Sequence, residues 1–128
     1  MADTLVDATI LIDATNNHPK AVRCVDELVL GKSAFTHAQV AAEVLMGTRD
    51  SKDQAKLQRF LRRFAMIHAS EADSQSALLY LARFHLPHDL GFGDCLIGTP
   101  ALRLNLPVAT LNVRHFRLFP GLKVICPY

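Results

Sequence analysis

The chain has 128 residues, a length that fits one domain and no more. Of these residues 50% are hydrophobic and 20% are charged, so the chain can bury a core and is not an intrinsically disordered protein. The formal net charge of +2 is too small to indicate nucleic-acid binding from composition alone.

The N-terminal segment and the cysteines indicate the compartment. The first residues lack the positive region and apolar stretch of a secretory signal, and the early apolar segment is short and broken by Asp7. Cys24, Cys95 and Cys126 are an odd set without Cys-x-x-Cys spacing, which favours neither a disulfide framework nor a zinc site. We expect a cytoplasmic protein with reduced thiols and no membrane span.

Hydrophobic periodicity, together with the Pro and Gly residues that begin or end helices, predicts the elements of the first half of the chain. They are a buried strand at Leu5-Val6, a helix from about Thr9, a helix from Pro19 that Gly31 ends, a strand over 33–36, a helix over 38–46 that Gly47 ends, and a helix over 51–64.

The second half continues the alternation of strands and helices. Its predicted elements are a strand at 66–67, a helix opened by the capping box at 70–73 and running to about His85, a break at 86–88, a helix over about 92–104 that Pro100 should kink, a strand over 107–110 and an edge strand at 124–125. The sequence therefore predicts an α/β fold, with a short parallel sheet and helices on both faces, in a single domain over 1–128.

Three acidic residues lie at positions where such a sheet gathers functional groups, beyond the carboxyl ends of its strands. Asp7 follows the first strand, Glu43 is on the helix after the second strand, and Asp94 is in the first turn of the helix before the fourth strand. Converging carboxylates would suit Mg²⁺ or Mn²⁺. Each acid also has an ordinary structural reading: Asp7 as a helix cap, Asp94 as a helix-dipole partner and Glu43 as a solvated side chain.

Four sequence blocks in a fixed order resemble PIN domains, in particular the VapC-type toxin ribonucleases of toxin–antitoxin pairs. The blocks are Val6–Ile12, the pair Phe35-Thr36 with Ala42–Gly47, Gly93–Leu102 and Leu106–Phe116. The resemblance implies a PIN-like three-layer fold and an endoribonuclease that hydrolyses RNA with Mg²⁺ or Mn²⁺. It also implies a small cognate antitoxin as partner and a homodimer.

The resemblance also implies roles for individual residues. Asp7, Glu43 and Asp94 correspond to the catalytic acids that hold the metal. The polar side chains expected to line the pocket are those of Thr9, Thr36, Thr110 and His115.

Three departures from the family pattern stand out in the same blocks. Ala8 replaces a common Thr and Pro100 a common Ala, and the last block has Asn112 and His115 where the family often has another Asp. With Asn112 as a neutral fourth ligand, we expect one tightly held ion and a second that is held weakly.

A basic helix face leaves a further question open. Lys52, Lys56, Arg59 and Arg63 recur at helical spacing, so they share one face. That face is either solvated, or contacts RNA phosphates, or meets an antitoxin tail.

Two other classes of protein remain as alternatives. A PIN-like binding module with a weakened active site would act through a protein partner. A phosphate-transfer receiver or phosphatase also has an Asp after its first strand, but it needs a second adjacent acid, and Asp7 is followed by Ala8 and Thr9.

Overall fold

A five-stranded, fully parallel sheet forms the centre of the computed structural model, which describes residues 2–128. The strands are β1 (Thr4–Val6), β2 (Ala34–His37), β3 (Ala65–Ile67), β4 (Val108–Ala109) and β5 (Val124–Ile125), in the spatial order β3-β2-β1-β4-β5. The helices are α1 (Ala8–Thr15), α2 (Pro19–Leu30), α3 (Ala38–Met46), α4 (Ser51–Leu61), α5 (Glu71–His88), α6 (Phe92–Arg103) and α7 (Val113–Phe116).

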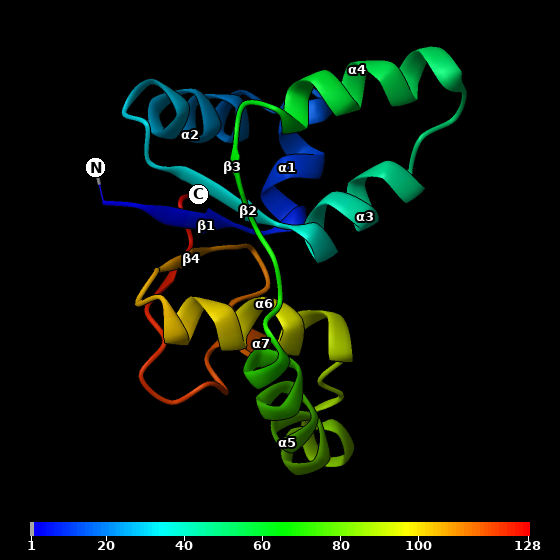
Figure 1. The fold of residues 1–128 in the computed structure, drawn as a ribbon. Coiled ribbons are helices and arrows are strands. Elements are labelled where there is room, and N and C mark those ends of the chain that lie inside the picture. The colour runs from blue at the N-terminus through cyan, green and yellow to red at the C-terminus, as the bar shows by residue number, and fades with distance from the viewer. Residues whose placement is uncertain (1) are drawn as a thin grey trace.

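The helices form a layer on each side of the sheet. Figure 1 shows α1 to α4 on one side and α5, α6 and α7 on the other. This three-layer α/β architecture confirms the predicted fold class. None of the helices in residues 2–128 is both long and apolar enough to cross a membrane.

The central strand owes its position to its apolar sequence. Leu5 and Val6 are completely buried, and Leu5 pairs with Phe35 on one side and with Val108 on the other. A strand that is covered on both faces can be continuously apolar. The apolar pair Leu5-Val6 therefore predicted a buried strand. The parallel register directs the carboxyl ends of β1, β2 and β4 to the same edge of the sheet.

Two predicted boundaries were wrong, and one short helix was not predicted. The break expected at 86–88 is absent, because α5 continues through Pro87 and ends where Asp89 adopts a left-handed conformation with φ of 57°. Pro87 lies in the last turn, where it removes a single backbone donor, and the His85 imidazole contacts the Leu90 carbonyl at 2.8 Å. The helix predicted over 51–64 ends at Leu61, and the short helix α7 was not predicted.

A buried carboxylate joins the two long helices of the second layer. Asp73 is 2% exposed and completes the capping box of α5, in which it accepts from the Ser70 amide at 2.9 Å. The same carboxylate receives two hydrogen bonds of 2.8 Å from the Arg103 guanidinium at the end of α6. A forked pair of this kind fixes orientation as well as distance, so it sets how α5 packs against α6.

Gly98 allows a close approach within the same layer. A Cβ atom at this buried position of α6 would lie 2.9 Å from the ring of Phe119. Phe119 is 1% exposed and cannot move into solvent, so a larger side chain at position 98 would disturb the packing of α6.

Candidate active site

Asp7 stands at the end of β1 with a buried carboxylate that does not cap the next helix. The residue is 3% exposed and occupies the N-cap position of α1, yet its side chain makes no capping hydrogen bond. Instead its Oδ2 accepts the hydroxyls of Thr110 at 2.8 Å and Thr9 at 3.2 Å. The reading of Asp7 as a helix cap therefore fails, and its burial has to be explained by the polar groups around it.

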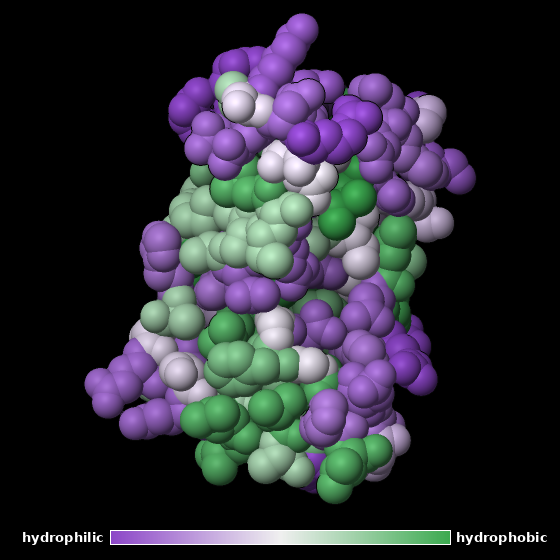
Figure 2. Space-filling view, turned by 90° about the vertical axis from the view of Figure 1, so that its right-hand side faces the viewer, coloured by the Kyte–Doolittle hydropathy of each residue, from purple (hydrophilic) through white to green (hydrophobic). Residues whose placement is uncertain are grey.

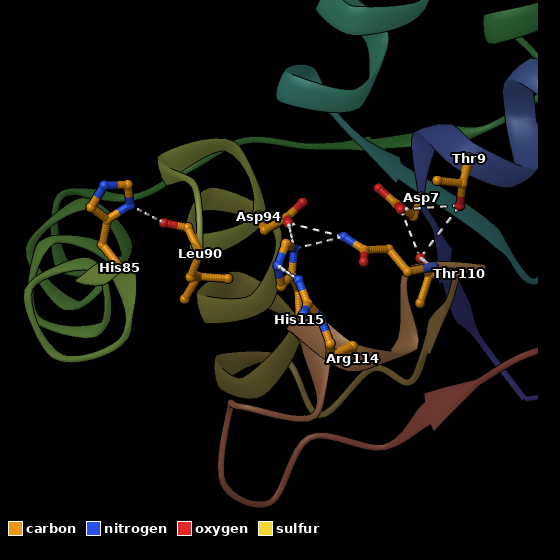
Figure 3. Close-up of polar contacts among 9 residues, drawn as sticks. Asp7, Thr9, His85, Leu90, Asp94, Thr110, Arg114 and His115 are labelled. Atoms are coloured by element: carbon orange, nitrogen blue, oxygen red, sulfur yellow. Dashed lines mark hydrogen bonds and ion pairs between the residues drawn. The ribbon is translucent and has the colours of Figure 1, made fainter. Parts of the chain in front are cut away.

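Thr9 and Thr110 are held so that their hydroxyl protons face Asp7 (Figure 3). The oxygen of Thr9 accepts from the Leu111 amide at 3.0 Å, and that of Thr110 accepts from the Asn112 amide at 2.9 Å. A hydroxyl that already accepts from a backbone N–H has its own proton left to donate. The loop after β4 therefore orients the Asp7 carboxylate through the hydroxyls of Thr9 and Thr110.

Asp94 lies in the first turn of α6, and Figure 3 shows its carboxylate and that of Asp7 pointing toward one another. Burial raises the pKa of Asp94, and the charges of Asp7 and Glu43 raise it further, while His115 acts in the opposite direction. The charges of Asp7 and Glu43 both act on Asp94, which indicates that the three predicted acids lie near one another.

His115 and Asn112 both contact Asp94. His115 Nδ1 and Asn112 Nδ2 are each 3.2 Å from Asp94 Oδ2. Arg114 Nη2 lies 3.2 Å from His115 Nε2, and a guanidinium can only donate, so the proton of the neutral ring belongs on Nδ1. His115 thus donates to Asp94 and orients it, and Asn112 turns its amide nitrogen toward the same oxygen.

Glu43 is brought to the cluster by Gln39 and by the absence of a side chain at Gly93. Gln39 Nε2 donates to Glu43 Oε1 at 3.2 Å, one helical turn apart on α3. A Cβ atom on Gly93 would lie 3.1 Å from Gln39 Nε2 and 3.2 Å from Glu43 Oε1. Glu43 therefore rests against the first turn of α6, next to Asp94.

Gln39 and Gly93 are residues of the site that the sequence reasoning missed. The i,i+4 spacing of Gln39 and Glu43 is a signal that could have identified the first of them. The role of Gly93 follows only from the packing of α3 against α6, which no local pattern reveals.

Thr36, which we expected to line the pocket, contacts the backbone of the site. It is completely buried, and its hydroxyl donates to the Val6 carbonyl at 3.1 Å. This bond ties the end of β2 to the end of β1, one residue before Asp7. Thr36 thus supports the backbone of the site through this bond.

The four residues of the predicted basic helix face are exposed. They are Lys52, Lys56 and Arg59 on α4 and Arg63 just after it. Arg63 forms an ion pair of 2.7 Å with Asp26, whereas Lys52, Lys56 and Arg59 are in no ion pair with any residue in 2–128. Glu43 and Lys56 line one cavity of about 330 Å³. The basic helix face therefore borders the acidic cluster.

The donor set fits a divalent cation by its chemistry, although the acids are not gathered into a finished coordination shell. Within residues 2–128, no three His, Cys, Asp or Glu side chains are close enough to hold a metal ion as they stand. Asp7 and Glu43 are contacted only by hydroxyl and amide donors, and His115 is the one basic side chain against Asp94 among the described residues. The cluster thus carries uncompensated negative charge, which a hard cation would neutralise.

Comparison with known proteins identifies the family. The profile of the PIN domain matches residues 4–121, nearly the whole chain. The chain belongs to the PIN-domain family. The PIN resemblance of the four sequence blocks is thereby confirmed.

Similar relatives and solved structures cover between 66% and 100% of this chain. Ribonuclease VapC19 of Mycobacterium tuberculosis is 29% identical over 121 residues, which are 93% of this chain and 96% of that protein. Ribonuclease VapC10 of the same organism is 33% identical over 85 residues, 66% of this chain and 64% of that protein. DNA-bound VapBC from Salmonella typhimurium superposes with a TM-score of 0.81 at 21% identity over 100% of both chains. A toxin–antitoxin complex from Klebsiella pneumoniae gives 0.77 at 22% identity over 98% of both chains.

Proposed function

We propose that this PIN protein is a metal-dependent endoribonuclease and the toxin of a VapBC-type toxin–antitoxin pair. Two relatives named ribonucleases support the activity, and the toxin–antitoxin complexes among the similar structures support the partner. The observation that carries the proposal is the uncompensated acidic cluster, in which Asp7 and Glu43 raise the pKa of the half-buried Asp94.

Asp7, Glu43 and Asp94 are the residues that would hold Mg²⁺ or Mn²⁺. A divalent ion bound there would activate a water and stabilise the charge that develops on the phosphodiester. Thr9 and Thr110 keep the Asp7 carboxylate in place, and His115 does the same for Asp94. Arg114 donates to Nε2 of the His115 ring, the nitrogen that does not contact Asp94.

The test of the function is cleavage of a structured RNA by the purified protein. Cleavage with Mg²⁺ or Mn²⁺, and none after chelation, is the expected result. A protein that binds an antitoxin tightly and leaves RNA intact under every metal condition would instead be the PIN-like binding module. Co-expression with the neighbouring small reading frame supplies the antitoxin for that comparison.

Changing Asn112 to Asp is expected to strengthen metal binding in the absence of RNA. A fourth carboxylate beside Asp94 adds negative charge, so it should lower the melting temperature of the metal-free protein and enlarge the increase caused by Mn²⁺. Calorimetric titration and thermal unfolding with and without Mn²⁺ measure both effects. If the variant and the wild type bind Mn²⁺ equally, Asn112 is not the position of a fourth ligand.

Replacing Lys52, Lys56 and Arg59 with Gln is expected to weaken RNA binding and to flatten its salt dependence. Each lost phosphate contact should reduce the slope of log K against log salt by about 0.7 for single-stranded RNA. Binding is measured with the Asp94→Asn protein, so that the RNA stays intact. Arg63 is left unchanged because it pairs with Asp26.

The matched control removes the same charge from another surface. The triple change of Lys32, Arg83 and Arg117 to Gln is made at exposed residues outside α4. If the slope of log K against log salt is unchanged in the α4 variant, or decreases equally in both variants, the α4 face is a solvated surface that does not contact RNA.

A homodimer is proposed through the second helix layer. On α5, Leu78, Leu79 and Leu86 are 56%, 73% and 92% exposed. In the space-filling view, apolar residues gather in the lower part of the face, and hydrophilic residues cover the upper part (Figure 2). Burial of such leucines against a second copy would be favourable by about 25 cal/mol per Å².

A further inference from the structure

A groove on the α2 side of the sheet lies apart from the acidic cluster. It has a volume of about 480 Å³ and runs between α2 and the strands β4 and β5. Ala109 and Ile125 form part of its floor, whereas α2 packs chiefly against α1 and β2. Parallel sheets are normally covered on both faces, so the last two strands are left open here. The volume is within the range of small-molecule sites.

Three cations surround the groove without a partner. Lys20 and Arg23 approach from one face of α2, and Lys123 approaches from the start of β5. None of the three forms an ion pair with an acid in residues 2–128. Among residues 2–128, Glu27, one turn further along α2, is the only acid that lines the groove.

The end of the groove is closed by Tyr128, which is fixed in position. Its hydroxyl donates to Asp13 Oδ2 at 2.8 Å, and its ring stacks on His18 with centroids 4.8 Å apart and an interplanar angle of 22°. Because these two contacts already fix the Tyr128 side chain, a ligand loses no binding free energy in ordering it. The groove is therefore preformed, which lowers the cost of binding.

We propose that this groove binds a small organic phosphate with a planar, nitrogen-bearing body, the chemistry of a nucleoside monophosphate. The three cations match the two charges and three oxygens of a phosphate, and the apolar floor suits the faces of a base. Glu27 offers an acceptor for an amino group of that base. No residue of the acidic cluster lines the groove, so this binding site is independent of the proposed RNA cleavage.

Cys24 provides a direct readout, because its thiol lines the groove and is half-buried. Cys95 is completely buried, and Cys126, which is exposed, is replaced with Ser. Burial and, to a lesser degree, the charge of Glu27 raise the pKa of the Cys24 thiol, so alkylation by iodoacetamide is followed at alkaline pH. Mass spectrometry then gives the rate at Cys24 in the presence of each ligand.

The ligands are AMP, GMP, CMP and UMP, with adenosine and inorganic phosphate as separate arms. At ten times its Kd, a bound nucleotide should slow alkylation about 11-fold, while adenosine and phosphate alone protect much less. The Lys20, Arg23 and Lys123 triple change to Gln should abolish protection. The Lys52, Lys56 and Arg59 triple, with the same change of charge, should retain it.

Three results would overturn the proposal. They are no protection by any of the four nucleotides at millimolar concentration, equal protection in both triple variants, and stronger protection by a short single-stranded RNA than by any monophosphate. The last result would assign the groove to an RNA backbone. Alkylation does not depend on ribonuclease activity, so failure of either proposal leaves the other intact.

Discussion

Replacing Asp94 with Asn is expected to reduce RNA cleavage by at least about 100-fold while leaving the protein folded. The loss corresponds to roughly 3 kcal/mol of transition-state stabilisation, within what a correctly held divalent ion supplies. Asn keeps the size of the side chain and a carbonyl oxygen, but it lacks the negative charge. Initial rates on a structured RNA, measured with saturating Mg²⁺ or Mn²⁺, give the size of the effect.

The stability of the same variant distinguishes loss of a ligand from loss of the fold. Burial, Asp7 and Glu43 raise the pKa of Asp94, so ionised Asp94 destabilises the metal-free fold at any pH above that raised pKa. The variant should therefore melt at a higher temperature than the wild type at neutral pH. The difference should shrink as the pH falls through the raised pKa and the wild-type carboxyl becomes protonated. Asp3→Asn, at an exposed position, is the matched control. Wild-type cleavage by the Asp94 variant would remove Asp94 from the site.

Replacing Asp73 with Ala is expected to reduce the free energy of unfolding by about 2–3 kcal/mol, close to the cost of breaking a buried ion pair. The carboxylate is 3% exposed and loses bonds to Arg103 and to the Ser70 amide together. The estimate stays at the lower end because Arg103 is 43% exposed and regains water. Urea denaturation at neutral pH measures the loss.

The pH dependence of this effect has a definite sign. The hydrogen bonds from Arg103 outweigh burial and lower the pKa of Asp73, so its stabilising effect is present above the ordinary carboxyl pKa. It is lost as the pH falls through the lowered pKa, and wild type and variant should then converge in acid. Asp53→Ala is the control, since Asp53 has the corresponding place in α4 and pairs with exposed Arg49 at 3.7 Å. That change should cost less than about 1 kcal/mol, and equal losses in the two variants would contradict the account given for Asp73.

The parts of the fold that could be predicted are those with a local cause. The apolar pair before Asp7 indicated the central strand, and the capping box at Ser70 marked the first residue of α5. The end of α5 could not be read in the same way. Pro87 normally ends a helix, but near a C-terminus it removes only one donor, and the contact between His85 and Leu90 holds the turn.

In the candidate site too, the residues with a local sequence signal could be predicted, and those placed by tertiary packing could not. The positions of Asp7 and Asp94 followed from strand ends and family blocks, and the mutual charge effects agree with their grouping. The supporting contacts of Glu43 arise where α3 meets α6, elements separated by about fifty residues, so no window of sequence contains them. The family blocks indicated Asn112 as a neutral fourth ligand, and its side-chain nitrogen lies 3.2 Å from Asp94 Oδ2, a placement that depends on the loop after β4.

The insertion of β4 beside β1 has a consequence for the order of events during synthesis. Asp7 is made 103 residues before Thr110, whose hydroxyl orients it, and Asp94 is made 21 residues before His115, which contacts it. A nascent chain that still lacks this segment has neither the neighbouring strand nor the oriented carboxylates, because domains fold as units. The acidic site proposed for RNA cleavage is therefore completed only after the segment that contains Thr110 and His115 has been made and folded.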